Sequence, residues 1–208
     1  EVRYIRSGDS IPGDAGLVII PGSKSTIADL AAFRRNGWDQ DLAAHVRRGG
    51  HVAGICGGYQ MLGRLVRDPA GIEGEPASVE GLGLLDIETT MEKTKAVRNS
   101  HAHCQIFDAG LTGYEIHLGR TVGPDCMRPF STIDGRPDGA VSKDGRVFGT
   151  YLHGLFANDA FRHGYLSRLG LSQSGVNYSA LVDEALDSIA ERLETLISRD
   201  FPGFSPRD

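Results

Sequence analysis

The chain has 208 residues, of which 40% are hydrophobic and 24% are charged, and its formal net charge is -5. This size suits one well-buried domain, the acidic balance provides no basic surface for nucleic acid, and no segment approaches the roughly 18 apolar residues of a membrane span. Three cysteines without C-x-x-C spacing favour a reducing compartment over a disulfide framework, so we expect a cytoplasmic protein.

The first part of the chain alternates short apolar runs with helix-forming segments. GLVIIP (16–21) predicts a strand buried on both faces, and HVAGI (51–55) predicts a second apolar strand. Between them, the serines and threonine of GSKST offer N-cap oxygens to a helix through IADLAAFRR, and another helix covers about 38–48. A further helix is expected from YQMLGRLV. This order predicts parallel βαβ units in an α/β sheet.

The pattern changes in the second part. Residues 67–83 are rich in Gly, Pro and Glu and predict a loop, whereas LLDIETT, AVRNSHAHCQIF and GYEIHLGR predict consecutive strands without helices between them. Asp144-Gly145 between two apolar runs indicates a hairpin. Helices over about 158–169 and 178–198 and a loose tail, FPGFSPRD, close the chain. We therefore expect a mixed, mostly parallel sheet flanked by helices, with an antiparallel extension.

The segment GICGG (54–58) places a cysteine between glycines, after a strand and before a helix. This arrangement is typical of a nucleophile elbow, because a sharp strand-to-helix turn leaves room only for neighbours without Cβ. A helix N-terminus lowers the pKa of a thiol, so the position alone predicts an activated Cys56. The alternative is a small buried residue at a tight turn.

A catalytic cysteine needs a base, and the chain has seven histidines. His153 follows the predicted strand VFGTYL, and side chains at the carboxyl ends of parallel strands line the active crevice of an α/β sheet. His117 in GYEIHLG is the second candidate, whereas His45 and His163 fall inside predicted helices and are expected to be packing or surface residues. We therefore expect His153 to be the partner of Cys56.

Two further motifs have alternative interpretations. The loop PGSKS (21–25) offers backbone N–H groups for an oxyanion hole; a phosphate loop would need Gly directly before Lys, where Ser23 stands. HAHC suggests zinc, but on a strand His101 and His103 share one face while Cys104 points to the other. We expect neither a phosphate site nor a bound metal, and we expect Cys126 to be a loop or core thiol.

Four segments together resemble one family. VIIPGSKSTIADL, GICGGYQMLG, GYEIHLGR and GTYLHGLF occur in this order over nearly the whole chain. They resemble the class I glutamine amidotransferase domain of the cobyric acid synthase type. The resemblance implies a flavodoxin-like α/β domain that hydrolyses glutamine and passes ammonia to a synthetase that amidates a corrin ring.

The resemblance also implies roles for individual residues. Cys56 would form a γ-glutamyl thioester, and His153 would act as its base and then protonate the leaving ammonia. The backbone N–H groups of Gly22 and Gly57 would form the oxyanion hole. The remaining implied positions are pocket or interface residues: Tyr59, Gln60, Glu115 and His117.

One position departs from the family pattern. Many class I domains have a glutamate two residues after the histidine, and here that residue is Leu155, so the sequence fits a Cys-His dyad of low activity until a partner rearranges the site. No Walker motif is present, so we expect no cofactor in this chain, and we assign ATP, magnesium and the corrin to a synthetase partner.

The start at Glu1 favours one glutaminase domain over 1–208 as the C-terminal part of a longer enzyme. The alternatives are the corresponding domain of cobyrinic acid a,c-diamide synthase or of an enzyme that amidates peptidoglycan lipid precursors. A catalytically silent glutamine-binding module and an elbow-type hydrolase of other substrates also stay open.

Overall fold

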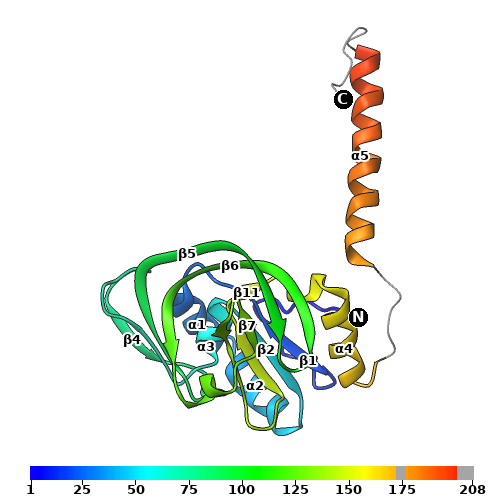
Figure 1. Cartoon of the computed structure of the whole chain (residues 1–208). Coiled ribbons are helices and arrows are strands. Elements are labelled where there is room, and N and C mark those ends of the chain that lie inside the picture. The colour runs from blue at the N-terminus through cyan, green and yellow to red at the C-terminus, as the bar shows by residue number, and fades with distance from the viewer. Residues whose placement is uncertain (172–176, 201–208) are drawn as a thin grey trace. The chain divides into compact units, whose positions relative to one another are not determined.

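The chain divides into two compact units, Glu1–Leu155 and Phe156–Asp208. The structure, a computed structural model, describes residues 1–171 and 177–200 (Figure 1). The predicted loose tail at 201–208 lies outside the described residues.

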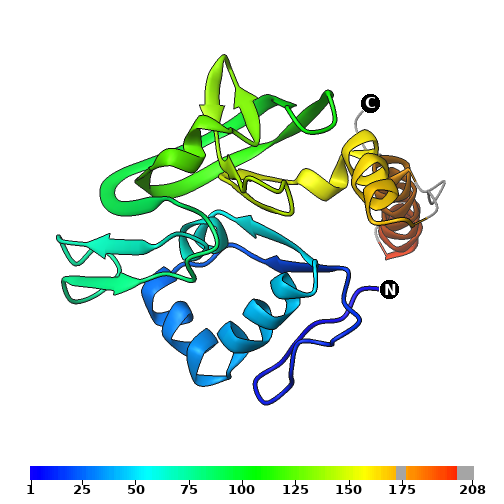
Figure 2. The same ribbon diagram turned by 90° about the horizontal axis from the view of Figure 1, so that it is seen from below.

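The first sheet of unit 1 has four strands in the order β1-β2-β10-β9. These are β1 (Leu17–Ile20), β2 (His51–Ile55), β10 (Val147–Thr150) and β9 (Ala140–Val141). β1, β2 and β10 run parallel, and β9 pairs antiparallel with β10 through the predicted Asp144-Gly145 hairpin. Helices α1 (Thr26–Arg35) and α2 (Trp38–Arg47) connect β1 to β2 and lie on one side of this sheet (Figure 2). The parallel sheet flanked by helices is confirmed.

The mostly antiparallel part is larger than an extension, because it forms a second, seven-stranded sheet with one parallel pair. Its path is β11-β6-β5-β3-β4, with β7 joined to β5 and β8 joined to β7. The strands are β3 (Leu65–Asp68), β4 (Ala77–Glu80), β5 (Glu88–Cys104), β6 (Ala109–Val122), β7 (Ser131–Ile133), β8 (Arg136–Asp138) and β11 (Leu152–His153). β5 and β6 form one long hairpin, paired from Glu88↔Val122 to Cys104↔Ala109.

Three local predictions were wrong. Helix α3 covers only Gly57–Met61, and the expected helix does not continue, because Arg64 donates its backbone N–H to the Ile87 carbonyl and the chain enters β3. The predicted loop at 67–83 contains β4, which pairs with β3. β1 is an edge strand rather than a strand buried on both faces, and Ile19 is 46% exposed.

In the core of unit 1, helix α3, which follows Cys56, packs against both sheets. Ile20, Leu30, Val52, Leu62 and Ile87 are members of one buried cluster, each 5% exposed or less. These residues come from β1, α1, β2, the end of α3 and the approach to β5. The apolar runs of the sequence therefore meet around the segment that carries the cysteine.

Replacing Gly58 with alanine should lower the free energy of unfolding by about 3 kcal/mol. A Cβ at Gly58 would lie 2.0 Å from the Ile20 carbonyl oxygen and 2.8 Å from that of Pro21, and backbone atoms cannot rotate aside. Urea denaturation measures the difference. Gly13→Ala is the control, since nothing lies within 4 Å of a Cβ there. Similar small losses in both variants would contradict this prediction.

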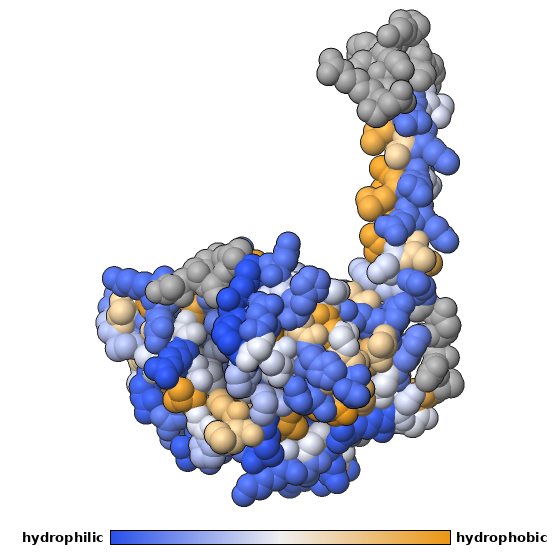
Figure 3. Space-filling view, viewed as in Figure 1, coloured by the Kyte–Doolittle hydropathy of each residue, from blue (hydrophilic) through white to orange (hydrophobic). Residues whose placement is uncertain are grey.

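Unit 2 contains α4 (Asp159–Arg168) and α5 (Tyr178–Asp200), close to the predicted bounds. Short 3-10 helices also occur, η1 (Pro124–Met127) in unit 1 and η2 (Leu155–Ala157) at the boundary. Along α5 runs a row of exposed apolar side chains spaced three or four residues apart, visible in Figure 3: Val182, Leu186, Ile189, Leu193 and Leu196. In the described part of the chain, no helix combines the length and apolar character that a bilayer crossing requires.

Candidate functional site

Cys56 lies on the sharp turn that joins β2 to α3. Its backbone has φ 53° and ψ -111°, a conformation that side chains with a Cβ rarely adopt. The turn is held by a hydrogen bond from the Cys56 N–H to the Thr150 carbonyl (2.8 Å) in β10. Gly54 has to lack a Cβ, because one would lie 2.8 Å from the Gly58 carbonyl oxygen. The expected elbow geometry is therefore present.

His153 and Gly22 lie beside Cys56. A Cβ built on Gly22 would lie 3.2 Å from the His153 ring carbon Cε1 and 3.5 Å from Cys56 Cβ. On the neighbouring side, a Cβ on Gly57 would lie 2.8 Å from the backbone nitrogen of Ser23. The β1–α1 loop, the elbow and β11 therefore converge at one point. The sequence placed His153 directly after a strand VFGTYL, but β10 ends at Thr150 and His153 lies in β11 of the second sheet.

The thiol is covered by β6. Cys56 is only 7% exposed, and its Sγ donates to the Ile116 carbonyl at 3.2 Å. Burial raises the pKa of the Cys56 thiol, the charge of Glu73 adds to this effect, and a hydrogen bond with the Gly57 backbone opposes it. In this conformation burial therefore acts against the lowering of the thiol pKa that is expected at a strand-to-helix turn.

Burial and ring stacking, rather than a bonded carboxylate, define the environment of His153. Its Nε2 is buried without a hydrogen-bond partner among the described residues. Burial lowers the pKa of His153, and the Ile116 carbonyl opposes this shift. The ring of Tyr114 stacks on the imidazole with centroids 4.8 Å apart and planes 5° apart. Leu155, two residues further on, is 2% exposed and supplies no charge.

The two residues predicted to shape the glutamine pocket differ in their placement. Gln60 is buried and bridges three elements: its Nε2 donates to the Leu118 carbonyl (2.8 Å) and to the Tyr151 hydroxyl (3.3 Å), and its Oε1 accepts from Thr26 (3.1 Å). Tyr59 instead belongs to the hydrophobic core. Its ring lies edge-on to that of Tyr151 with centroids 5.2 Å apart, so its position reflects packing.

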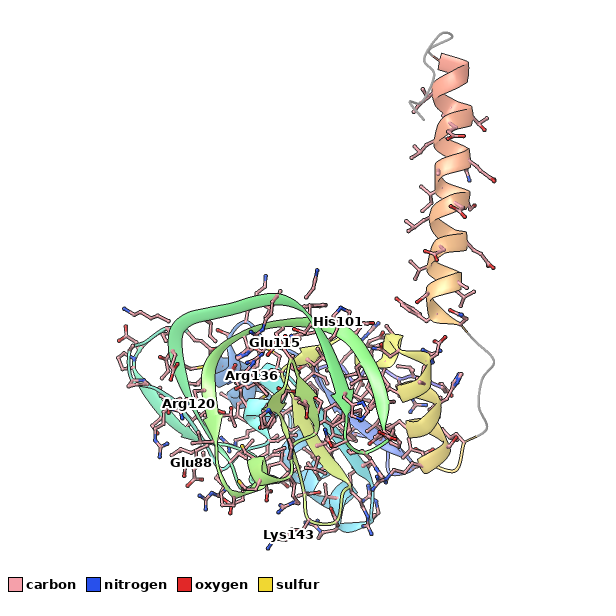
Figure 4. All side chains as sticks on the ribbon, viewed as in Figure 1. Glu88, His101, Glu115, Arg120, Arg136 and Lys143 are labelled. Atoms are coloured by element: carbon pink, nitrogen blue, oxygen red, sulfur yellow. The ribbon has the colours of Figure 1, made fainter. Side chains whose placement is uncertain are left out.

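Glu115 and His117 occupy the next positions of β6. Burial favours the neutral form of Glu115, but the hydrogen bond and charge of Arg98 hold the pKa of this carboxyl below its usual range. Arg136 approaches Glu115 at 3.5 Å, and Figure 4 shows the two side chains together. His117 stacks on Tyr151 at 3.8 Å, and burial lowers its pKa. The described hydrogen bond of the Cys56 thiol goes to the carbonyl of Ile116, which lies between them in the sequence.

Both side chains line a cavity of about 230 Å³, which Tyr151, Arg120 and Arg136 also border. Cys56 and His153 do not line it.

Glu73 is a residue of interest that the sequence did not reveal. Its carboxylate accepts from the Thr26 hydroxyl (3.0 Å) and the Ile27 N–H (3.2 Å), so it caps α1 where a serine cap was expected; the Ser25 side chain makes no cap bond. Asp68 fixes the preceding turn by accepting from the backbone N–H of Glu73 at 2.8 Å. Thr26 bonds both Glu73 and Gln60, so the Glu73 carboxylate lies near the helix that follows Cys56.

Most of the chain matches a known protein family. The CobB/CobQ-like glutamine amidotransferase domain matches residues 1–161. The chain belongs to this family. As an amidotransferase domain it is 60% identical over 200 residues to the cobyric acid synthase of Brucella canis, and 62% identical over 194 residues to that of Rhizobium johnstonii.

These matches cover 96% and 93% of this chain but only 41% and 40% of the two relatives, so the chain spans about two fifths of their length. Among solved structures, the amidotransferase domain is similar to PurLQS from Thermotoga maritima, with a TM-score of 0.57 and 20% identity over 81% of this chain and 84% of that one. A glutamine amidotransferase crystal structure gives a TM-score of 0.52 with 17% identity over 75% and 80%. These two likenesses support the fold.

The remaining histidines and cysteines of the amidotransferase domain lie elsewhere. His45 is buried and bonded to the His51 carbonyl (2.9 Å), as expected of a packing residue. On β5, His101 and His103 are exposed while Cys104 is buried, which matches the predicted alternation. Cys126 lies in η1, with its sulfur 3.8 Å from the Tyr59 hydroxyl. No described trio of His, Cys, Asp or Glu is arranged to hold a metal ion.

Proposed function

We propose that this chain is the glutaminase domain of a cobyric acid synthase, hydrolysing glutamine and supplying ammonia for the amidation of corrin carboxylates. The observation that carries this proposal is Cys56 on a strained elbow beside His153 and Gly22. The identity of about 60% to cobyric acid synthases supports the choice of client.

The reaction follows from the dyad. His153 takes the proton of the Cys56 thiol, and the thiolate attacks the side-chain amide carbon of glutamine. When the tetrahedral intermediate collapses, the C–N bond breaks and His153 returns the proton to the departing ammonia. Water, deprotonated by His153, then hydrolyses the γ-glutamyl thioester to glutamate and restores the thiol.

Backbone and carboxylate groups would hold the substrate. The N–H groups of Gly22 and Gly57 flank the elbow and are suited to stabilise the oxyanion. Glutamine also carries an ammonium group, and Glu73 offers a negative charge near the thiol that is already fixed by two hydrogen bonds. Gln60 would shape the pocket by tying α3 to β6.

Glutamine can reach the thiol only after the β6 backbone that covers the thiol has moved. In this conformation the Ile116 carbonyl takes the hydrogen bond of Cys56, so β6 has to shift before an amide carbon can reach the sulfur. A protonated thiol and a neutral, desolvated imidazole favour low basal turnover. This supports a site that is activated by its synthetase partner.

The partner would supply the rest of the reaction. ATP and magnesium would act on the corrin carboxylates in the synthetase part, and this domain would contribute ammonia. All three cysteines are free, which supports the expected cytoplasmic setting.

The test is intact-mass spectrometry after incubation with a glutamine-like diazo-ketone, with and without excess glutamine. We expect one adduct, on Cys56, and protection by glutamine. The buried Cys104 serves as the internal control, and Cys56→Ala should give no adduct. An adduct that glutamine does not prevent would favour a hydrolase of other substrates, and the absence of any adduct on Cys56 would contradict an assembled glutaminase site.

The client is tested by joining this domain to its synthetase. Glutamine-dependent amidation of a corrin substrate supports the proposal. Amidation of only the a and c carboxylates, or of a peptidoglycan lipid precursor, would instead assign the domain to one of the related amidotransferases.

A further inference from the structure

His153 has to keep its ring in one plane to take a proton from Cys56 and later deliver it to ammonia. A carboxylate bonded to the ring is the usual means, but the pKa of His153 responds only to burial and to the Ile116 carbonyl. Its Nε2 finds no hydrogen-bond partner among the described residues. The Ile116 carbonyl thus holds the ring by a hydrogen bond, and a contact on the face of the ring would complete the definition of its plane.

Tyr114 is in the position to do so. In the β11–β6 pairing it is the direct partner of His153, while Glu115 faces Leu152. The two rings are almost parallel, 5° apart, with centroids separated by 4.8 Å. Tyr114 is 44% exposed, so one face of its ring covers the imidazole while much of the side chain remains in solvent. Because Tyr114 is this exposed, core packing does not explain the position of its ring.

We propose that Tyr114 is the positioning residue of His153, fixing the plane of the imidazole by stacking and stabilising the imidazolium that forms when the thiol proton is transferred. The proposal rests on the proposed glutaminase function. The negative face of an aromatic ring attracts a cation within about 6 Å of its centroid, and the observed separation falls within that range.

The other ionisable groups near His153 act in different ways. From the elbow, Cys56 exchanges a proton with it. From β6, His117 lies close enough for electrostatic repulsion between the two rings, and the charge of Glu115 is already neutralised by Arg98 and Arg136. On β6 the protonated imidazole is therefore supported by the Ile116 carbonyl and by Tyr114, and Tyr114 is the one that acts through a side chain.

The test compares Tyr114→Phe with Tyr114→Leu in the full 208-residue chain. Phenylalanine keeps the aromatic face, whereas leucine keeps an apolar cover but lacks the face. We expect Tyr114→Phe to retain kcat within about twofold and Tyr114→Leu to lose about 10- to 100-fold in kcat with little change in KM. Val122→Ala, an equally exposed site on the same strand, is the control and should match wild type.

The pH dependence gives a second readout. Without the aromatic face the imidazolium loses support, so the pKa of His153 falls and its neutral form persists to lower pH. The acid limb of kcat/KM should therefore move to lower pH by about half a unit in Tyr114→Leu and stay in place in Tyr114→Phe. NMR titration of the His153 ring, assigned by its loss in His153→Gln, measures the same shift without turnover.

Several results would overturn the proposal: wild-type kcat in Tyr114→Leu, equal losses in both Tyr114 variants, or a change confined to KM. A raised His153 pKa in Tyr114→Leu would also overturn the proposal. The Tyr114 ring would then only exclude solvent from the imidazole and would not stabilise its protonated form. Failure of the glutaminase function itself is distinguishable, since wild type would then hydrolyse no glutamine while the NMR titration would still report the effect of the stacked ring.

Discussion

Cys56→Ala should reduce glutamine hydrolysis by about 10⁴-fold or more, because no other group near the elbow can form the thioester. The fold should survive, since alanine keeps the Cβ and loses only the sulfur of a small side chain, on a turn whose strained backbone already accommodates a Cβ. The measurement is glutamate release by the purified variant, with circular dichroism to verify the fold.

Cys126→Ala is the matched control. This thiol is half-buried and lies beside Tyr59 in the core, so its loss should leave the rate within a few-fold of wild type. If Cys56→Ala kept substantial activity, the elbow would not be the site of the chemistry.

His153→Ala should lower kcat by about 10²- to 10⁴-fold, the usual contribution of a positioned general acid-base. The loss should affect both formation of the thioester and release of ammonia. A stopped assay of ammonia production, together with the alkylation rate of Cys56, separates the two steps, because alkylation needs only the thiolate.

The exposed His101 on β5 provides the control, and His101→Ala should behave as wild type. An unchanged rate in His153→Ala would point to another base. His117 would be the first to examine, since it lies within electrostatic reach of His153.

The sequence predicts the site best where the residues that the chemistry needs also determine the local backbone conformation. The glycines around Cys56 predict the elbow because only they fit it. His153 could be paired with Cys56 because β2 and β10 run parallel and end at the same edge of the first sheet, although His153 itself lies beyond β10, in β11 of the second sheet. The helices were also predictable, except that the expected continuation of α3 became β3, where Leu65–Asp68 pairs with two other strands. Periodicity in a short apolar run does not distinguish these outcomes.

The groups that surround Cys56 and His153 and affect their reactivity had no comparable signal in the sequence. The Ile116 carbonyl is a backbone group, and any residue would supply it. Tyr114 stacks on His153 only because of the register between β6 and β11, and residues 39 positions apart do not reveal their pairing. Glu73 comes from a segment that looks like a loop, and its role depends on the turn fixed by Asp68.

The backbone of Cys56 has a consequence for the choice of residue at this position. A non-glycine residue at φ 53° and ψ -111° costs about 1–3 kcal/mol, and glycine, which adopts positive φ freely, would avoid most of that cost. Glycine at position 56 would thus be the more stable choice, but it would remove the thiol. Stability and the proposed reactivity therefore favour different residues at the same turn.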